Sequence, residues 1–262
     1  MKESAEIGVI GGTGVCSPNL LKNIEKVEIN TPYGKPSSPL TIGTLGGRKA
    51  AFLFRHGEES HSIPPHKVNW RANIWALKEL GCSRVLATCA TGSLKEELKP
   101  GDMVIVDQFI DLSKGAHTFY DGGNVYHTGM AEPFCPDLRK LLAETGKRLG
   151  IPIHEKGTYI RIEGPQFSTR AASNMYKQFA DIIGMTGVPE AILAREKEMC
   201  FGIVATVTDY DSWIGHSTPF EEMKKVMAQN LENTRNILRK AVPLVPEERG
   251  CHCKDALKGA EA

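Results

Sequence analysis

Two carboxylates, Asp209 and Asp211, follow an almost wholly apolar run at residues 201–207 that is typical of a buried strand. In open α/β sheets, ligands bind just beyond the carboxyl ends of the strands. An aspartate with an ordinary pKa of about 3.9 is a poor proton donor at neutral pH, but burial beside a second carboxylate raises that pKa. The pair is therefore a candidate general acid, Asp209, with its neighbour Asp211. The spacing alone also fits a solvated Asp-Tyr-Asp turn.

A second set of polar groups is suited to binding an oxyanion. Thr13 lies in a glycine turn, GGTG, that follows the strand-like run 7–10, and such a turn offers backbone N–H groups to an anion. The G-x-G-x-x-G spacing of dinucleotide sites is absent, so inorganic phosphate fits better than a pyrophosphate. Arg55 and His56 follow the run 49–54, and a guanidinium presents a planar fork of donors. The alternative for Arg55 is a surface salt bridge.

These groups must be positioned by an alternation of strands and helices. Strand-like runs cover residues 7–10, 40–45, 49–54, 85–88, 103–109, 156–162, 182–183 and 201–207. Helical spacing covers residues 69–80, 137–149, 170–179, a segment opened by Pro189, and 219–242. The pattern predicts one large α/β domain over residues 1–245, with two small domains as the alternative. Residues 246–262 are expected to form a mobile or separately tethered tail.

Composition narrows the class of partner. The chain has 262 residues, 41% of them hydrophobic, and 32 Lys and Arg against 31 Asp and Glu. A net charge of +1 gives no electrostatic reason to expect nucleic acid or an anionic membrane, so the partner should be a small molecule. No run of eighteen apolar residues and no signal-peptide core are present, which favours a soluble, cytoplasmic protein.

The seven cysteines are scattered along the chain and are expected to be free, mostly buried thiols. Cys251-His252-Cys253 stands out, because two sulfurs flank a histidine in the polar tail. Zinc sites usually need four ligands and no second half is visible, so no metal is expected, and a local redox pair or disulfide is the alternative. Cys135 and Cys200 would close a loop of about 65 residues if their segments pack together, which makes them a candidate disulfide.

Taken together, the motifs resemble the S-methyl-5′-thioadenosine phosphorylases of the purine nucleoside phosphorylase superfamily, from about residue 7 to about residue 242. The motifs, in order, are GGTG at 11–14, RHG at 55–57, NIWAL at 73–77, GSL at 92–94, EGPQF at 163–167, GMT at 184–186 and TDYD at 208–211. The resemblance implies a single-domain mixed twisted sheet flanked by helices. It also implies self-association as a homotrimer or a dimer of trimers, and no cofactor, with inorganic phosphate as co-substrate.

The resemblance carries roles to individual residues. Those resembling the phosphate site are Thr13, Arg55, His56, Cys89, Ala90 and Thr186. Those resembling the nucleoside site are Met185 at the ribose, Phe167, Asp209 and Asp211 at the base, Phe220 and Met223 at the 5′ alkylthio group, and His127, donated by a neighbouring subunit. The chain departs from the family where Gly184 and Gly187 stand in place of the common Asn and Thr, which concerns substrate preference more than the reaction.

The implied reaction is phosphorolysis of S-methyl-5′-thioadenosine to adenine and 5-methylthioribose 1-phosphate. Asp209 would give a proton to the purine N7, and an acceptor carboxylate suits the 6-amino group of adenine. One alternative is a broader purine nucleoside phosphorylase that acts on adenosine, inosine or methylthioinosine. Alternatives from other classes are an NAD-dependent dehydrogenase, suggested only by the first glycine turn, and a nucleoside-binding module without catalysis.

Overall fold

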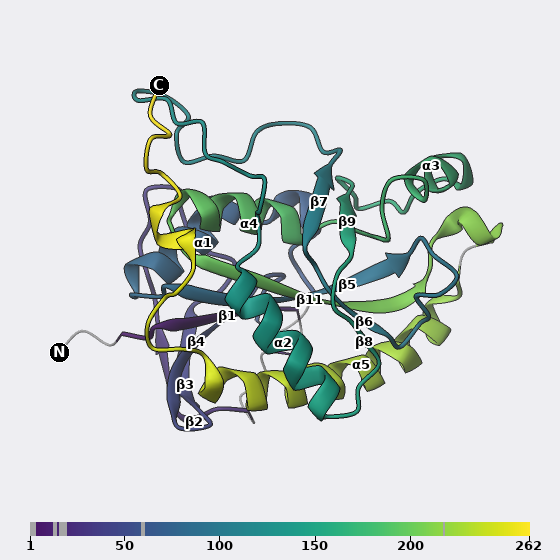
Figure 1. Cartoon of the computed structure of the whole chain (residues 1–262), viewed down its shortest axis with the longest axis horizontal. Helices are drawn as coiled ribbons and strands as arrows, with labels where there is room; N and C mark the ends of the chain where they lie inside the picture. The colour runs from purple at the N-terminus through teal and green to yellow at the C-terminus, as the bar shows by residue number, and fades with distance from the viewer. Residues whose placement is uncertain (1–3, 13–14, 16–19, 59–60, 217) are drawn as a thin grey trace.

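The computed structural model describes residues 4–262 except 13–14, 16–19, 59–60 and 217. In this described part, eleven strands form one mixed sheet, and helices cover both of its faces (Figure 1). Helices α1 and α4 pack together on one face, whereas α2 and α5 pack together on the other. The predicted mixed α/β fold is confirmed.

The elements have the following bounds. The strands are β1 Ile7–Gly11, β2 Lys22–Val27, β3 Leu40–Leu45, β4 Arg48–Phe54, β5 Arg84–Ser93, β6 Met103–Ile105, β7 Gln108–Asp111, β8 Ile153–His154, β9 Thr158–Arg161, β10 Ile182–Gly184 and β11 Cys200–Tyr210. The helices are α1 Trp70–Glu79, α2 Pro136–Arg148, α3 Arg170–Tyr176, α4 Gly187–Glu196 and α5 Phe220–Ala241. Short 3-10 turns are Pro65–Lys67, Ser212–Ile214, Val242–Leu244 and His252–Asp255. No helix of the described residues is both long and apolar enough to cross a membrane.

Four parallel strands form the centre of the sheet, in the order β4, β1, β5 and β11. Every residue of β1 is buried, and so are the first nine of β11, as expected for strands covered by helices on both faces. Because these strands run in one direction, their carboxyl ends meet at one edge of the sheet, where Arg55 and Asp209 lie. Antiparallel pairing of β2 with β3, of β3 with β4, of β6 with β11 and of β10 with β5 makes the sheet mixed.

Three differences from the predicted strands have physical reasons. The strand predicted at 85–88 continues to Ser93, because β5 pairs with β11 up to Tyr210 and with β10 on its other side. The run 103–109 is two strands, since the chain leaves β11 at β6 and joins β9 at β7. The strand β2 has no apolar alternation, because all but one of its residues are exposed, and its sequence pattern gave no signal.

The tail, residues 246–262, is packed against the rest of the chain, so of the two expected alternatives the structure has the tethered end and not the mobile one. Arg84 donates hydrogen bonds to the carbonyl oxygens of Pro246 and Glu247 at 2.7 and 2.6 Å. Farther along, Ala262 N donates to Val125 O at 3.0 Å. The tail therefore reaches the long loop between β7 and α2, where the C-terminus lies (Figure 1).

Candidate active site

A cavity of about 860 Å³ opens at the edge where the carboxyl ends of the parallel strands meet. Its walls come from the ends of β4, β5 and β11, from the segment leading into α4, and from the first half of α5. Ten of the predicted site residues line it: Arg55, His56, Cys89, Ala90, Phe167, Met185, Thr186, Asp209, Asp211 and Met223. The structure thus brings together residues that lie up to 168 positions apart in the sequence, from Arg55 to Met223.

Three predicted residues are not among this lining. Thr13 lies outside the described residues, and Phe220 begins α5 but its side chain is also not described. His127 is exposed, and its backbone N–H donates to Ala260 O at 2.8 Å. Because the role predicted for His127 is in the site of a neighbouring subunit, it stays a prediction.

Asp209 lies at an irregularity in β11. The register with β5 shifts between Val207 and Asp209, which is the signature of a β-bulge, a feature that re-aims side chains. Burial of the carboxyl group is the main cause of a raised pKa at Asp209. A hydrogen bond from Thr208 Oγ1 at 2.6 Å opposes the rise, and the charge of Asp211 adds to it. A raised pKa is the property that a proton donor needs, although the neighbouring carboxylate contributes less than burial does.

Asp211 is buried and held at both ends. Its backbone N–H donates to Ser93 O at 2.9 Å, and its Oδ2 accepts a short hydrogen bond from Ser168 Oγ. Ser212 Oγ in turn donates to Ser168 O at 2.8 Å. The loop that carries Phe167 is therefore fastened to the end of β11. The sequence motif at 163–167 stops short of Ser168, and no local pattern indicated the role of this serine.

Arg55 forms a buried ion pair with Glu190, a residue of α4. Arg55 Nε and Nη2 donate to the two carboxylate oxygens at 2.5 and 2.8 Å, and Nη1 donates to Thr88 O at 2.9 Å. The side chains are 2% and 0% exposed, so the surface salt bridge considered as an alternative was wrong. Burial is the largest single influence and opposes the guanidinium charge, but the charge and hydrogen bonds of Glu190, with smaller contributions from Cys89 and Tyr159, together raise the pKa of Arg55.

The Arg55–Glu190 pair changes how the predicted phosphate clamp would work. Most of the donors of Arg55 point at protein acceptors, and its charge is balanced within the fold. In the sequence Glu190 is only an acid that follows Pro189 at the start of a helical segment, and no local pattern identifies a partner 135 residues away. Arg55 thus contributes a fixed donor at the cavity wall rather than a net positive charge.

His56 is a neutral imidazole. Burial, with the nearby charge of Arg55, lowers the pKa of His56 to about 3. Its Nδ1 lies 2.8 Å from Ile63 O, and since a carbonyl oxygen only accepts, Nδ1 carries the proton. The other ring nitrogen, Nε2, is then an acceptor. His61 stacks on His56 with ring centroids 3.9 Å apart and fixes the orientation of the ring.

Thr186 occupies the N-cap position of α4 and does not use its side chain to cap that helix. The N-terminus of α4 therefore opens at the cavity wall beside a threonine hydroxyl, an arrangement that favours an anion. Thr186 N donates to Tyr159 Oη at 3.1 Å. The tyrosine also explains Gly184, because a Cβ there would come within 2.2 Å of the Tyr159 hydroxyl oxygen.

Cys89 and Ala90 complete the wall on β5. Arg55 Nη2 lies 3.9 Å from the Cys89 sulfur. Burial raises the pKa of the Cys89 thiol, so it is not a thiolate. Ala90 is exposed toward solvent although it lies within a strand, and it lines the cavity. The phosphate-side wall is thus rich in neutral donors.

The opposite part of the cavity is apolar. Met185, Met223 and Met227 line it together with Phe167, whose side chain is 68% exposed. Such a surface suits a planar base or an alkyl group, since methionine and aromatic side chains adapt to both. The cavity therefore combines an anion-binding end, an acid with a raised pKa and an apolar side.

Comparisons with known proteins agree with this geometry. The family model described as the phosphorylase superfamily matches residues 6–243. The S-methyl-5′-thioadenosine phosphorylase of Pyrococcus abyssi is 56% identical over 97% of this chain and 98% of its own length. That of Nitrosopumilus maritimus is 48% identical over 100% of both chains.

Solved structures give the same relationship. A methylthioadenosine phosphorylase sourced from an Antarctic soil metagenomic library superposes with a TM-score of 0.94 at 42% identity, covering 100% of this chain and 93% of that one. The methylthioadenosine phosphorylase from Schistosoma mansoni in complex with tubercidin gives a TM-score of 0.89 at 38% identity, covering 98% and 97%. The chain therefore belongs to the phosphorylase superfamily and, within it, to the S-methyl-5′-thioadenosine phosphorylases.

Proposed function

We propose that this nucleoside phosphorylase cleaves S-methyl-5′-thioadenosine with inorganic phosphate to give adenine and 5-methylthioribose 1-phosphate. One observation carries the assignment to the reaction. A single cavity holds a partly buried aspartate with a raised pKa, Asp209, and an anion-binding wall that includes Arg55, His56 and Thr186. Phosphorolysis needs a proton donor and an anionic nucleophile in the same space.

The proposed reaction transfers the sugar from the purine to phosphate. The C1′–N9 bond breaks with its electron pair going to the purine, and Asp209 donates its proton to N7 of the departing base. A phosphate oxygen forms the new bond to C1′ of the cationic sugar. Asp211 lies beside Asp209, held by Ser168, and keeps the base-binding loop in place. Adenine is preferred because a carboxylic acid can donate to N7 and accept from the 6-amino group at once.

Phosphate is held by several donors and one acceptor. Thr186, the N-terminus of α4 and the remaining guanidinium N–H of Arg55 donate to its oxygens, with Thr13, Cys89 and Ala90 as the rest of the proposed phosphate wall. His56 Nε2 accepts a hydrogen bond from a P–OH group, because its other nitrogen already donates to Ile63 O. Monohydrogen phosphate suits this site, because it offers one P–OH donor to His56 and oxygen acceptors to the other groups.

The apolar side of the cavity would hold the 5′ methylthio group. Met223 is only 8% exposed, and Met185 and Met227 line the same cavity. Placing a 5′ hydroxyl there costs its hydrogen bonds to water, so adenosine should be a poorer substrate. We further propose, from the family resemblance, that Phe220 belongs to this pocket and that no cofactor is needed.

The proposed active species is a homotrimer or a dimer of trimers. In this arrangement His127 of one subunit would reach the 5′ end of the nucleoside bound by its neighbour. A cyclic head-to-tail interface allows every subunit to donate one loop and to receive another.

The test is to incubate the protein with S-methyl-5′-thioadenosine and to follow free adenine by chromatography, with and without phosphate. Adenine should appear only with phosphate, together with one equivalent of 5-methylthioribose 1-phosphate. Adenosine, inosine and methylthioinosine serve as competing substrates. Adenine release that does not depend on phosphate would refute phosphorolysis. A higher kcat/KM for inosine than for S-methyl-5′-thioadenosine would refute the proposed substrate.

A further inference from the structure

Four cysteines gather at the end of β11 that lies away from the active-site cavity. Cys200 is the first residue of β11, whereas Asp209 is its last but one. The sulfur atoms of Cys135, Cys200, Cys251 and Cys253 all lie within 4.8 Å of one another, and all four side chains are buried. These residues are called the cysteine cluster below.

The spacing of the sulfurs fits a metal ion. Cys251 Sγ lies 3.3 Å from Cys200 Sγ and 3.6 Å from Cys135 Sγ. In a tetrahedral zinc site with Zn–S bonds of about 2.3 Å, the sulfurs are roughly 3.8 Å apart. A covalent S–S bond is about 2.05 Å long, so the sulfurs stand too far apart to be bonded. A group within 4.8 Å has room for one ion and not for a multi-iron cluster.

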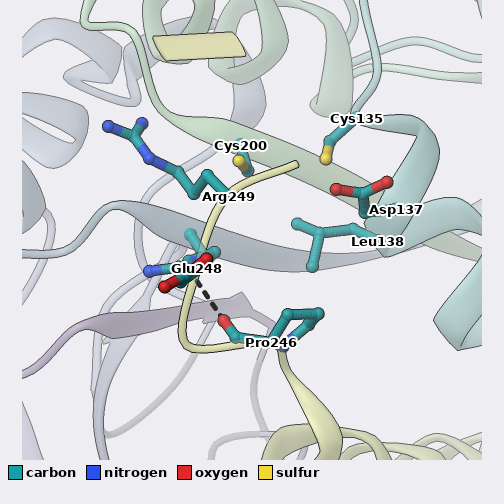
Figure 2. A pocket seen from close by; sticks show the side chains of 8 residues that line it. Cys135, Asp137, Leu138, Cys200, Pro246, Glu248 and Arg249 are labelled. Carbon is teal, nitrogen blue, oxygen red and sulfur yellow. Dashed lines mark hydrogen bonds between the residues drawn. The ribbon is translucent and has the colours of Figure 1, made fainter. Parts of the chain in front are cut away.

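Each ligand segment is held in place by contacts outside the cysteine cluster. Cys135 N donates to Phe201 O at 2.9 Å, which fixes the start of α2 against β11. Cys200 N donates to Ser83 O at 2.9 Å. The tail that carries the other two ligands is anchored upstream by Arg84. Figure 2 shows Cys135 and Cys200 beside the tail residues at a small cavity of about 10 Å³.

Basic groups surround the cysteine cluster and suit its charge. Four thiolates around a divalent ion carry a net charge of about −2. Arg195 Nη1 donates to Cys253 Sγ at 3.8 Å, and Arg84 and Arg249 line the adjoining small cavity, as do the acids Asp137 and Glu248. Cys135 is the N-cap of α2, whose partial positive charge favours an anionic sulfur. Such outer groups orient the ligands of metal sites and tune their affinity.

We propose that the cysteine cluster binds one Zn²⁺ ion as a structural tetrathiolate site that fastens the C-terminal tail to β11 and α2. Four sulfur ligands in this geometry select zinc over harder metals, and the absence of a position for water makes such a site structural. No metal was expected from the sequence, because no second pair of ligands is visible near Cys251 and Cys253. The fold supplies that pair from Cys135 and Cys200, which the sequence analysis considered only as a disulfide.

The first experiment measures metal and thiols in the wild-type protein, purified under reductant with zinc in the growth medium and then desalted. We expect about one zinc per chain by elemental mass spectrometry, and loss of that zinc with a fall in the melting temperature when a mercurial displaces it. Exchange with Co²⁺ should give the visible absorption of tetrahedral cobalt thiolate. Less than about a tenth of an equivalent of zinc, with the four sulfurs recovered as two disulfides after alkylation, would overturn the proposal.

Variants locate the site. Cys253→Ser should lower the zinc content at least about tenfold, and Cys135→Ser should do the same from a distant segment. Cys82→Ser is the matched control, because Cys82 is an equally buried thiol that the cysteine cluster does not include. It should keep its zinc. If a cluster variant fails to fold, the wild-type measurement still decides, and equal zinc in all three variants would refute the assignment.

Discussion

Glu190→Gln tests the buried ion pair that the structure places behind the phosphate wall. The substitution keeps the size and one oxygen acceptor but removes the charge that balances Arg55. Both side chains are at most 2% exposed, so solvent cannot replace the lost charge. Breaking a buried ion pair by changing one partner costs about 3–5 kcal/mol of stability. Because the amide of the glutamine keeps one acceptor, we expect a loss of about 3 kcal/mol.

The expected loss is large enough to measure. For a chain of this size, each kcal/mol shifts the melting temperature by roughly 2–4 °C, so the variant should melt roughly 6–12 °C lower than wild type. Phosphate should reverse part of this loss, because a bound dianion supplies the missing countercharge to Arg55. By the same reasoning, the phosphate KM should fall several-fold, while the nucleoside KM changes little.

The assay combines thermal unfolding over a series of phosphate concentrations with initial rates at saturating nucleoside. Glu144→Gln is the matched control, because its pair with Arg148 on α2 is exposed and should change stability by less than about 0.5 kcal/mol. Arg55→Ala should instead raise the phosphate KM, since it leaves the Glu190 carboxylate facing the site. A Glu190→Gln variant with wild-type stability, or with a higher phosphate KM, would refute the role given to the pair.

Three other predictions follow from the cavity and its surroundings. Asp209→Asn should lower kcat/KM for S-methyl-5′-thioadenosine by roughly 10²–10⁴-fold, and unchanged turnover would exclude Asp209 as the acid. The pKa of Asp209 is raised, and only its protonated form can donate a proton. The wild-type rate should therefore fall as the pH rises through that pKa. The pH–rate profile of the Asp209→Asn variant should lack this fall. Gly184→Ala should destabilise the protein by about 1–3 kcal/mol in denaturant melts, since its Cβ would meet the Tyr159 hydroxyl oxygen at 2.2 Å, and a stable variant would contradict this packing. Dilution to monomer should abolish activity if His127 serves a neighbouring site, so sedimentation that shows a fully active monomer would disprove the trimer.

The central strands and the edge that carries the site could be predicted from the sequence. The runs that became β1, β4 and β11 are continuous and apolar, because helices cover both faces of these strands. Parallel strands in such a sheet bring their carboxyl ends together, so residues that follow each run, such as Arg55 and Asp209, were expected to converge. The order of motifs also indicated the family before any geometry was known.

Other features depended on contacts between distant segments, which a local pattern does not encode. Glu190 looks like any acid in a first helical turn until the fold brings Arg55 to it, and the bulge at Asp209 arises only from its register with β5. The split of residues 103–109 into β6 and β7 likewise follows from which neighbour each half pairs with.

The cysteines show the same division most clearly. From the sequence, Cys251 and Cys253 form half of a possible site in a polar tail, while Cys135 and Cys200 lie far away along the chain. The tertiary structure places all four sulfurs within 4.8 Å. Apolar periodicity is a property of one segment and can be found in its residues alone. Which segments become neighbours is decided by the packing of the whole sheet and its helices, and only the structure supplies that information.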